Sequence, residues 1–415
     1  MKEHLSQLLM EKAPNNRHGI CLEPQRALIS KSDLETIIHY GVPTSVDSPW
    51  ESASGGVGRN QTTALLASIG ESVERYCATI VQLPLFTKQS IKTSRLIDAE
   101  EWCLFNNKQR QQKDFPFNNI YTNKCMYTNV FDFQNNDEYF IPHPMVALRD
   151  DYETGVPTSS GLAAGATYKH ALLRATQELI ERDALMVTWL HGIAGRSIEV
   201  PKKYIDELKK LEGEVFAFDL TPQYSPFPVI AVAGGIMKQG NWRYSLGIAC
   251  REDISSAMDK AYLEWNQGIM FAGVYGDYVD TEKVGDLDKL KTFDEHAIFY
   301  TLNPELWNTL PLFASKHKIV KPLLTGTFRS LDESLKLIRK KFNQHKIRLY
   351  YRDLTTIDAQ QLGLSVVRVA SPDLAQIFAH QEWPLINRVD KLLTSRYPKS
   401  KKLTKFPNLM PHPLG

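Results

Sequence analysis

The stretch SGLAAGATYKHALLRATQELIERDA, from Ser160 to Ala184, decides the fold that we predict for this chain. It begins with a Ser/Gly-rich turn and continues as an apolar-periodic helix that ends in Glu-x-x-Glu-Arg. The segment SGGVGRNQTTALLASIGESVERY, from Ser54 to Tyr76, repeats this arrangement, and in both segments a glycine lies thirteen residues before the first glutamate of the motif. The repetition predicts an internal duplication.

Each Glu-x-x-Glu-Arg motif places two carboxylates on one helix face, because residues i and i+3 are neighbours on a helix. Set among Ala, Leu and Ile, these pairs should be partly buried, where a carboxylate is costly unless a cation meets it. Four carboxylates exceed what two arginines can neutralise, and a divalent metal cluster is the natural partner. The residues are Glu71, Glu74 and Arg75 in the first motif and Glu178, Glu181 and Arg182 in the second.

A nucleotide site is the use that we infer for these carboxylates, because Mg²⁺ takes oxygen ligands and shares them with phosphate oxygens. The chain contains no G-x-x-x-x-G-K-[ST] sequence, so the two Ser/Gly turns would bring backbone N–H groups to the phosphates at helix N-termini. The alternative is a pair of salt-bridge ladders on a solvated face, which are common. The repetition and the apolar flanks favour the metal or nucleotide role.

A third helix, predicted to follow Asp253 and to extend to about Phe271, carries a cation, a carboxylate and an amide in line. Lys260, Glu264 and Gln267 fall at i, i+4 and i+7. Taken alone, this spacing is also that of an ordinary ion pair worth about 0.3 kcal/mol. Beside the two acidic motifs it strengthens the prediction of a shared site.

The composition excludes several classes of protein. The chain has 415 residues, is 43% hydrophobic and has a net charge of +2, which is typical of a globular protein and argues against a nucleic-acid binder. Its five cysteines form no Cys-x-x-Cys pair, so we expect free thiols rather than a zinc ribbon or a disulfide framework. The longest apolar run, Pro228–Met237, is about half of a membrane helix. We expect a cytoplasmic protein that binds neither membranes nor nucleic acid.

Helix and strand patterns alternate along the chain and predict an α+β fold. We expect helices at 61–81, 168–191 and 331–342, and strands at 214–220, 228–237, 244–250, 347–355 and 364–372. We also expect a polar N-terminal preamble with helical stretches, a strand with an irregular edge at 141–148, and a peripheral insertion or lid at 275–320.

Together, these motifs resemble the YcaO-domain superfamily, and especially its peptide-modifying cyclodehydratases. The resemblance rests on GESVERY, the stretch from Ser160 to Ala184, YLEWNQ, DLTTIDAQQLGLSVVRVASPDL and a proline-spaced C-terminus, in the family's order from Ser52 onward. It implies a YcaO fold in which duplicated helix and sheet units surround an ATP site. The implied organisation is an N-terminal segment at 1–45, a catalytic domain at 46–400 and a Pro-containing tail at 401–415 that reaches the active site.

The resemblance also implies ATP and Mg²⁺ as cofactors and assigns individual residues to them. Mg²⁺ would be held by carboxylates that bridge it to the phosphates, and these are Glu71, Glu74, Glu178, Glu181 and Glu264. The remaining ATP-binding residues would be Ser68, Arg75, Arg182, Lys260 and Gln267.

Four positions depart from the family's pattern. His170 stands where many relatives have Glu, so one metal ligand is lost or replaced by an imidazole. Lys260 replaces the usual Arg, which keeps the charge but loses a planar bidentate donor. Ser160 and Val57 replace a frequent Asn and a frequent Lys. We expect ATP binding to persist with altered coordination.

The chain's end reads Pro411-His412-Pro413-Leu414-Gly415. On composition alone, a disordered Pro-rich end is the simpler interpretation. Azoline-forming relatives, however, end in a Pro-x-Pro-x-Pro tail, of which this chain keeps two prolines and has Gly415 in place of the third. The resemblance therefore implies that Pro411, Pro413 and Gly415 are catalytic, with the Gly415 carboxylate as a proton acceptor near the substrate amide.

The implied activity is heterocyclisation of a ribosomally made precursor peptide. A Cys, Ser or Thr side chain attacks the preceding carbonyl, ATP phosphorylates the resulting hemiorthoamide oxygen, and loss of phosphate leaves a thiazoline or (methyl)oxazoline. We expect a leader-binding partner protein of the ubiquitin-activating-enzyme-like type, because the chain has no room for such a fused domain, and an FMN-dependent dehydrogenase as a further partner. A homo-oligomer of this chain is also compatible with the sequence.

Two alternatives to azoline formation remain. One is another YcaO backbone modification, the formation of a thioamide or an amidine, and the PHPLG tail weighs against it. The other is a non-catalytic scaffold subunit of a peptide-modifying synthetase, and the intact Glu-x-x-Glu-Arg motifs weigh against that.

Overall fold

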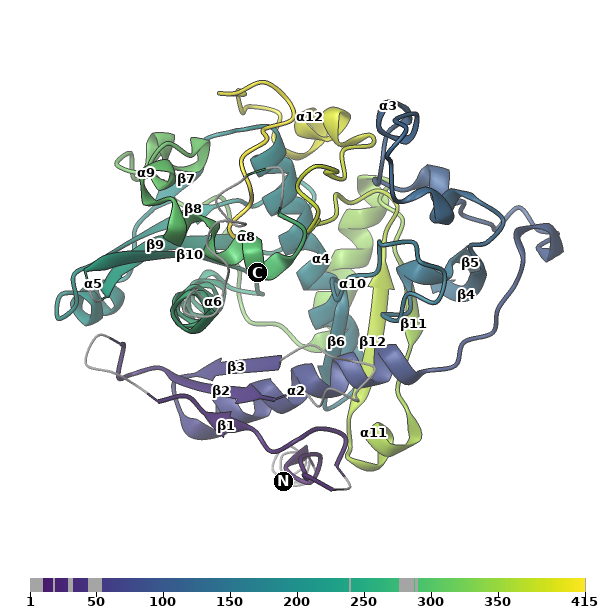
Figure 1. Ribbon diagram of the computed structural model, residues 1–415, viewed down its shortest axis with the longest axis horizontal. Helices are drawn as coiled ribbons and strands as arrows, with labels where there is room; N and C mark the ends of the chain where they lie inside the picture. The colour runs from purple at the N-terminus through teal and green to yellow at the C-terminus, as the bar shows by residue number, and fades with distance from the viewer. Residues whose placement is uncertain are drawn as a thin grey trace.

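The structure is a computed structural model that describes residues 10–17, 19–28, 33–43, 54–238, 240–275, 287 and 290–414. It contains helices and three antiparallel sheets (Figure 1), so the predicted α+β class is confirmed. The first sheet has the order β1-β2-β3, with strands Gln25–Arg26, Ile38–Val42 and Ser54–Gly58. The second has the order β10-β9-β8-β7, with strands Asn241–Cys250, Val229–Lys238, Gly213–Asp219 and Arg196–Ile198. The third has the order β5-β4-β11-β12-β6, with strands Glu138–Pro142, Tyr127–Asp132, Tyr350–Asp353, Ser365–Ala370 and Leu162–Gly165.

A long helix directly follows one edge strand of each sheet. Helix α2 (Gln61–Ile80) follows β3, α4 (Tyr168–Leu190) follows β6, and α6 (Ile254–Tyr275) follows β10. Each helix packs back against the strand that precedes it (Figure 1). The sequence predicted two Ser/Gly-rich turns followed by helices. In the structure these segments contain strands β3 and β6, and the described residues include a third unit of the same kind, β10 with α6.

A polar side chain begins each of these three helices. Asn60, Thr167 and Asp253 each accept a hydrogen bond from the backbone N–H three residues further on, at 2.9, 3.2 and 2.9 Å. Such N-caps satisfy one of the four N–H groups that have no partner within the helix. The turn between strand and helix is therefore short and fixed, which sets where the helix leaves the strand.

Two glycines allow a helix to approach its strand closely. A Cβ atom on Gly56 of β3 would lie 2.2 Å from the carbonyl oxygen of Ala64 in α2. A Cβ atom on Gly247 of β10 would lie 2.1 Å from the carbonyl oxygen of Ala261 in α6. Only glycine fits at either position, so both helices lie directly on their strands.

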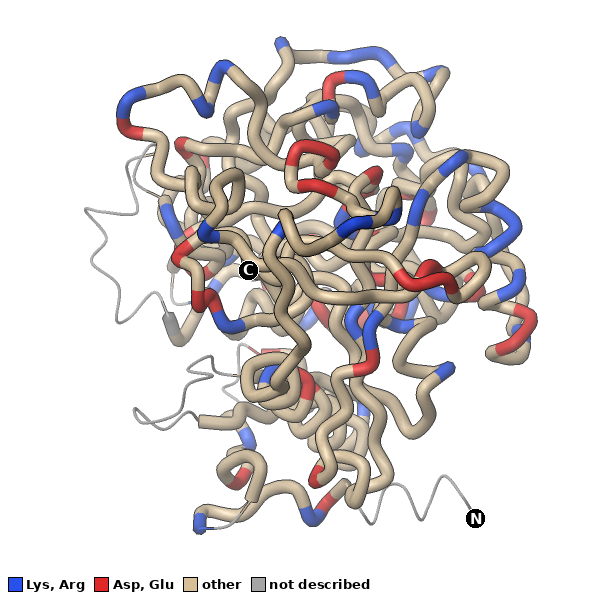
Figure 2. Tube along the Cα trace, turned by 90° about the vertical axis from the view of Figure 1, so that its right-hand side faces the viewer, with Lys and Arg blue, Asp and Glu red and all other residues tan. Residues whose placement is uncertain are grey.

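The remaining helices surround this framework. They are α3 (Asn107–Arg110), α5 (Lys202–Leu208), α8 (Phe293–Leu302), α9 (Pro304–Trp307), α10 (Leu331–Gln344), α11 (Ile357–Gln361) and α12 (Leu392–Arg396). Acidic and basic residues are interspersed along the described trace (Figure 2). Among the described residues, no helix is both long and apolar enough to cross a membrane.

Three predicted segments differ from the structure. The strand predicted at 141–148 is wrong beyond Pro142, where a 3₁₀ turn at His143–Met145 begins, because proline has no N–H to continue a ladder. The described part of the predicted peripheral insertion is wrong, since Tyr300 and Trp307 are fully buried; residues 276–286 lie outside the described residues. The described part of the N-terminal preamble contributes strands β1 and β2, which were not predicted; residues 1–9 lie outside the described residues, so its helical stretches stay a prediction.

Candidate functional site

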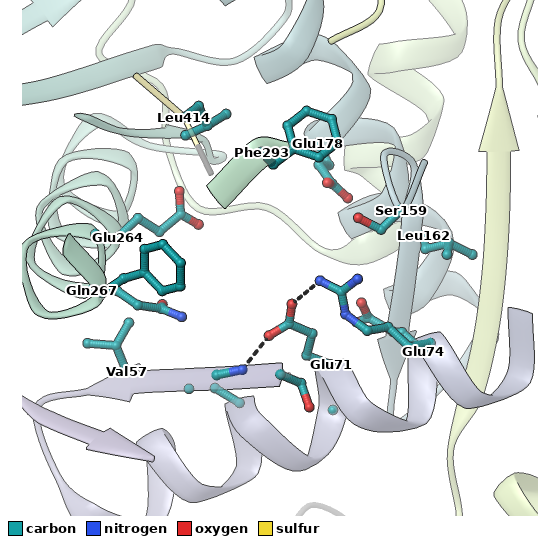
Figure 3. Close-up of a pocket in the computed structure, with 18 of the residues that line it drawn as sticks. Val57, Glu71, Glu74, Ser159, Leu162, Glu178, Glu264, Gln267, Phe293 and Leu414 are labelled. Carbon is teal, nitrogen blue, oxygen red and sulfur yellow. Dashed lines mark hydrogen bonds and ion pairs between the residues drawn. The ribbon is translucent and has the colours of Figure 1, made fainter. Parts of the chain in front are cut away.

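The three edge strands and their helices form the walls of a cavity of about 1500 Å³. Carboxylates on three different helices, Glu71, Glu178 and Glu264, extend toward a common space (Figure 3). The sequence-predicted residues that line the cavity are Glu71, Glu74, Arg75, Glu178, Glu181, Arg182, Lys260, Glu264, Gln267 and Pro413.

Two predicted residues do not line the cavity, and a third is not among the described residues. Ser68 is fully buried behind β3, and its hydroxyl donates to the Leu65 carbonyl oxygen at 2.8 Å. Pro411 is buried in the tail that precedes the cavity wall. Gly415 lies outside the described residues, so its role as a proton acceptor stays a prediction.

The first glutamates of the two motifs occupy equivalent positions. Each accepts a hydrogen bond from a backbone N–H at its own strand and another from the arginine one helical turn later. For Glu71 the donors are Gly55 N at 2.8 Å and Arg75 Nη2 at 2.7 Å (Figure 3, dashed lines). The corresponding donors to Glu178 are Gly161 N and Arg182 Nη2, both at 3.3 Å.

The second glutamates connect each helix to the edge strand of the next unit. Glu74 on α2 accepts a hydrogen bond from Ala164 N in β6 at 2.7 Å. Glu181 on α4 accepts from Cys250 N at the end of β10 at 2.6 Å, and from Arg251 Nη1 at 3.0 Å. The free N–H groups of an edge strand thus become donors to a carboxylate of the neighbouring unit.

The third unit completes this cyclic arrangement. On α6, Lys260 Nζ lies 3.1 Å from Glu264 Oε1. The amide of Gln267 faces β3, where a Cβ atom on Gly55 would lie 2.7 Å from Gln267 Nε2. Each of the three helices therefore presents a polar side chain to the edge strand of the next sheet, and the three units meet at the cavity.

Burial raises the pKa of three of these carboxylates, those of Glu74, Glu178 and Glu181. It raises the pKa of Glu74 to about 8, with the neighbouring charges of Glu178 and Glu71 adding to the effect. Burial also raises the pKa of Glu181 to about 7, and the charge of Glu264 contributes. The largest cause of all three shifts is burial. Six acidic side chains and six Arg or Lys side chains of the described residues line the cavity, so the excess of carboxylates over cations that the sequence predicted is wrong.

The carboxylates fit Mg²⁺ that is bound together with phosphates. Among the described residues, no group of three His, Cys, Asp or Glu side chains is close enough to hold a metal ion alone, because the carboxylates are directed at N–H groups and arginines. Mg²⁺ is usually bound by one or two carboxylates, with phosphate oxygens and water completing its octahedron. The donor set matches that requirement.

The sequence interpretation missed three cationic residues of the cavity wall, namely Lys291 and the two arginines described here. Arg251 is paired with Glu181 at 3.0 Å. Arg174 pairs with Glu252 at 3.1 Å, and its Nε lies 3.3 Å from His170 Nε2. In the sequence, only their positions could have indicated these two arginines. Arg251 directly follows β10, and Arg174 lies one helical turn after His170, where the chain departs from the family's pattern.

The described part of the C-terminal tail reaches the cavity. Residues 411–414 are buried, and Pro413 and Leu414 line the cavity wall (Figure 3 labels Leu414). A disordered Pro-rich end would be exposed to solvent, so this part of the tail does not behave as composition alone suggested.

We expect the metal-free chain to lose stability as the pH rises from about 5 to 8. The folded-state pKa values of Glu74 (about 8) and Glu181 (about 7) lie above the ordinary carboxyl value, so the folded state keeps protons that the unfolded chain releases. Stability is then greatest below the ordinary pKa and falls as the pH passes through the raised values. Thermal melting in chelator should show a fall of Tm on the order of a few degrees.

The Glu74→Gln variant separates this effect from other titrating groups. It should show a flatter dependence of Tm on pH, and Mg²⁺ should stabilise the wild-type chain more at pH 8 than at pH 6, because metal and proton compete for the same oxygens. Identical pH slopes in the variant and the wild type would contradict the assignment.

Comparison with known proteins agrees with this geometry. The family model described as YcaO cyclodehydratase, ATP- and Mg²⁺-binding, matches residues 55–375. No curated protein matches the chain.

Several solved structures share the fold. A heterocyclase in complex with substrate and cofactor is 17% identical, with a TM-score of 0.73 over 96% of this chain and 57% of that one. YcaO from Methanopyrus kandleri bound with AMPPCP and Mg²⁺ is 16% identical, with a TM-score of 0.61 over 89% of each chain. A chain of the E. coli microcin synthetase McbBCD complex is 18% identical, with a TM-score of 0.61 over 87% of this chain and 90% of that one. The chain spans 57% of the first structure and 49% of the heterocyclase TruD.

Proposed function

The chain belongs to the YcaO family of ATP- and Mg²⁺-binding cyclodehydratases, and from this we propose that it is the ATP-dependent cyclodehydratase of a peptide-modifying system. Its substrate would be a ribosomal precursor peptide whose Cys, Ser or Thr residues become thiazolines or (methyl)oxazolines. The observation that supports the proposal most strongly is the cavity where the acidic helices of all three units meet the C-terminal tail.

The reaction requires an amide oxygen to leave, and that oxygen is a poor leaving group. After the side chain attacks the preceding carbonyl, transfer of a phosphoryl group from ATP to the hemiorthoamide oxygen makes departure as phosphate feasible. The carbon–oxygen bond breaks, a proton leaves the nitrogen, and the ring carbon–nitrogen double bond forms. Catalysis then consists of positioning and charge neutralisation.

The cavity residues have distinct roles in this proposal. Glu71, Glu74, Glu178, Glu181 and Glu264 would hold Mg²⁺, which supplies positive charge at the phosphate oxygens when it is bound. Arg75, Arg182 and Lys260 would neutralise the remaining phosphate charge, and Gln267 would bind a polar group of ATP. The tail would border the place where the peptide reacts.

The proposal includes partners. A leader-binding protein of the ubiquitin-activating-enzyme-like type would deliver the precursor peptide, and an FMN-dependent dehydrogenase could oxidise the azolines. The five cysteines are buried free thiols, which agrees with a reducing cytoplasm. The structure of the E. coli microcin synthetase with bound pro-MccB17 is of a complex with a peptide, a precedent for this kind of assembly.

Mass spectrometry of a candidate precursor peptide tests the reaction. Incubated with the chain, the leader-binding partner and Mg-ATP, the peptide should lose one water for each ring formed, and a reacting carbonyl labelled with oxygen-18 should yield labelled phosphate. Thioamide formation would instead exchange oxygen for sulfur and increase the mass. Saturable Mg-ATP binding without any change in peptide mass across candidate precursors would favour a scaffold subunit.

A further inference from the structure

Four consecutive carbonyl groups of the C-terminal tail each meet a different buried side chain. We call these four side chains the tail clamp. In order along the tail, Gln381 Nε2 lies 2.6 Å from the Leu409 carbonyl oxygen, and Trp189 Nε1 lies 2.6 Å from that of Met410. The Tyr300 hydroxyl lies 2.6 Å from the Pro411 carbonyl oxygen, and His296 Nδ1 lies 3.2 Å from that of His412.

The tail clamp is assembled from distant parts of the chain. Trp189 lies near the end of α4, His296 and Tyr300 lie on α8, and Gln381 lies in the segment after β12. Their exposed fractions are 5%, 0%, 0% and 6%. Gln381, Trp189 and Tyr300 each donate to one tail carbonyl group, and a buried donor without a partner is costly, so these three side chains need an extended segment with carbonyl groups in its place. His296 has a carbonyl oxygen at each ring nitrogen, that of Ala379 at 2.8 Å and that of His412 at 3.2 Å.

The clamp contacts the backbone of the tail rather than its side chains. Proline has no backbone N–H, so carbonyl oxygens are the hydrogen-bonding groups that Pro411 and Pro413 can offer. His412 adds one side-chain contact, because its Nε2 lies 2.6 Å from the Phe378 carbonyl oxygen and its ring stacks on His296 at 4.2 Å. These contacts define the register of the tail, since a shift by one residue moves an extended segment by about 3 Å.

We propose that the tail clamp is a peptide-binding groove of fixed register, that its occupant is this chain's own segment 409–414, and that the four clamp side chains are positioning residues that hold Pro413 and Leu414 at the cavity wall. The significance of the tail for catalysis rests on the proposed function. Occupancy of the groove does not, and it can be measured without turnover.

The test supplies the tail as a separate molecule. A chain that ends at Asn408 should bind the labelled synthetic peptide LMPHPLG (residues 409–415) saturably in fluorescence anisotropy, and the peptide should raise the Tm of that chain. Tyr300→Phe in the shortened chain should weaken peptide binding about fivefold, because it removes one hydrogen bond to a carbonyl. Tyr397→Phe is the matched control, since the Tyr397 hydroxyl donates to the Leu220 carbonyl at 2.7 Å, and it should leave peptide affinity unchanged.

A second design covers failure of the shortened chain to fold. A protease site placed between Asn408 and Leu409 lets the full chain fold before cleavage, and excess labelled peptide should then exchange with the cleaved tail. Absence of peptide binding in a folded shortened chain, or loss of the cleaved tail without rebinding, would overturn the proposal.

Activity measurements distinguish a tail that is positioned for catalysis from a tail that blocks the cavity. With a peptide substrate that the full chain cyclises, the shortened chain should lose cyclisation while keeping its KM for ATP, and LMPHPLG should restore kcat. Cyclisation by the shortened chain that equals or exceeds that of the full chain would mean that the segment blocks the cavity, which overturns the positioning role. If the full chain cyclises no peptide, the binding measurements still decide whether the groove exists.

Discussion

Replacing Glu181 by Gln is expected to abolish Mg-ATP binding and to reduce peptide turnover by about 100-fold or more while leaving the fold intact. Gln keeps the size of the side chain and an oxygen that can accept the hydrogen bond from Cys250 N, which is 2.6 Å long in the wild type. It removes the negative charge that would attract Mg²⁺ and that pairs with Arg251. The loss should therefore appear in metal and nucleotide binding rather than in stability.

The protonation of Glu181 offers an independent check. The pKa of the Glu181 carboxyl is raised to about 7, so this group is protonated and uncharged in the wild type below neutral pH. The amide of Gln imitates that uncharged state. Mg-ATP affinity of the wild type should accordingly fall as the pH drops from 8 to 6, and the variant should show little of this dependence.

Calorimetric titration with Mg-ATP, with circular dichroism to establish folding, is the measurement. Glu207→Gln is the matched control, since Glu207 on α5 is also paired with an arginine, Arg59, at 2.8 Å but does not line the cavity. It should bind Mg-ATP like the wild type. Wild-type affinity in Glu181→Gln would show that this carboxylate does not serve the metal.

The acidic motifs could be predicted because their chemistry is local. Spacing of i and i+3 places Glu71 beside Glu74 on any helix, and apolar neighbours predict their burial. The partners of these carboxylates could not be predicted, because Ala164 N and Cys250 N belong to edge strands that only the tertiary fold brings near. The same reason hid Arg174, whose position on the cavity wall depends on how α4 packs.

Other errors came from patterns that have two interpretations. The sequence AIFYTL of α8 is apolar on all sides, which is typical of a buried helix, yet the acidic residues before it suggested a peripheral segment. The Pro-rich tail has no internal hydrogen-bonding pattern from which order could be predicted. It is buried because side chains more than a hundred residues earlier, such as Tyr300, bind its carbonyl groups.

The glycines of the edge strands are a further feature that sequence alone does not explain. In a strand, glycine ordinarily weakens packing, so GGVG in β3 and the glycine of YSLGIAC in β10 would be interpreted as irregularities. In the structure, Gly56 and Gly247 are the positions where a helix backbone crosses its strand. These glycines therefore determine how near the carboxylates of a helix lie to the neighbouring strands.

Gly247→Ala should consequently destabilise the chain by about 1–3 kcal/mol or more and weaken Mg-ATP binding at the same time. The added Cβ atom would lie 2.1 Å from the Ala261 carbonyl oxygen and 2.3 Å from Trp265 N, and these are backbone atoms that cannot rotate away. Helix α6 must then move off β10, and with it Glu264 and Gln267 at the cavity. Thermal melting and calorimetric titration of the same preparation measure both effects.

Gly273→Ala on the same helix is the control with the opposite expected sign. Its Cβ atom would meet only the Arg243 side chain, at an ordinary contact distance of 3.6 Å, and Ala is favoured over Gly in a helix by about 1 kcal/mol. This variant should melt at or above the wild-type temperature and bind Mg-ATP normally. Gly247→Ala adds a methyl group between α6 and β10, whereas Gly273→Ala adds one outside this contact. If both variants behaved alike, the close approach of α6 to β10 would not determine the geometry of the site.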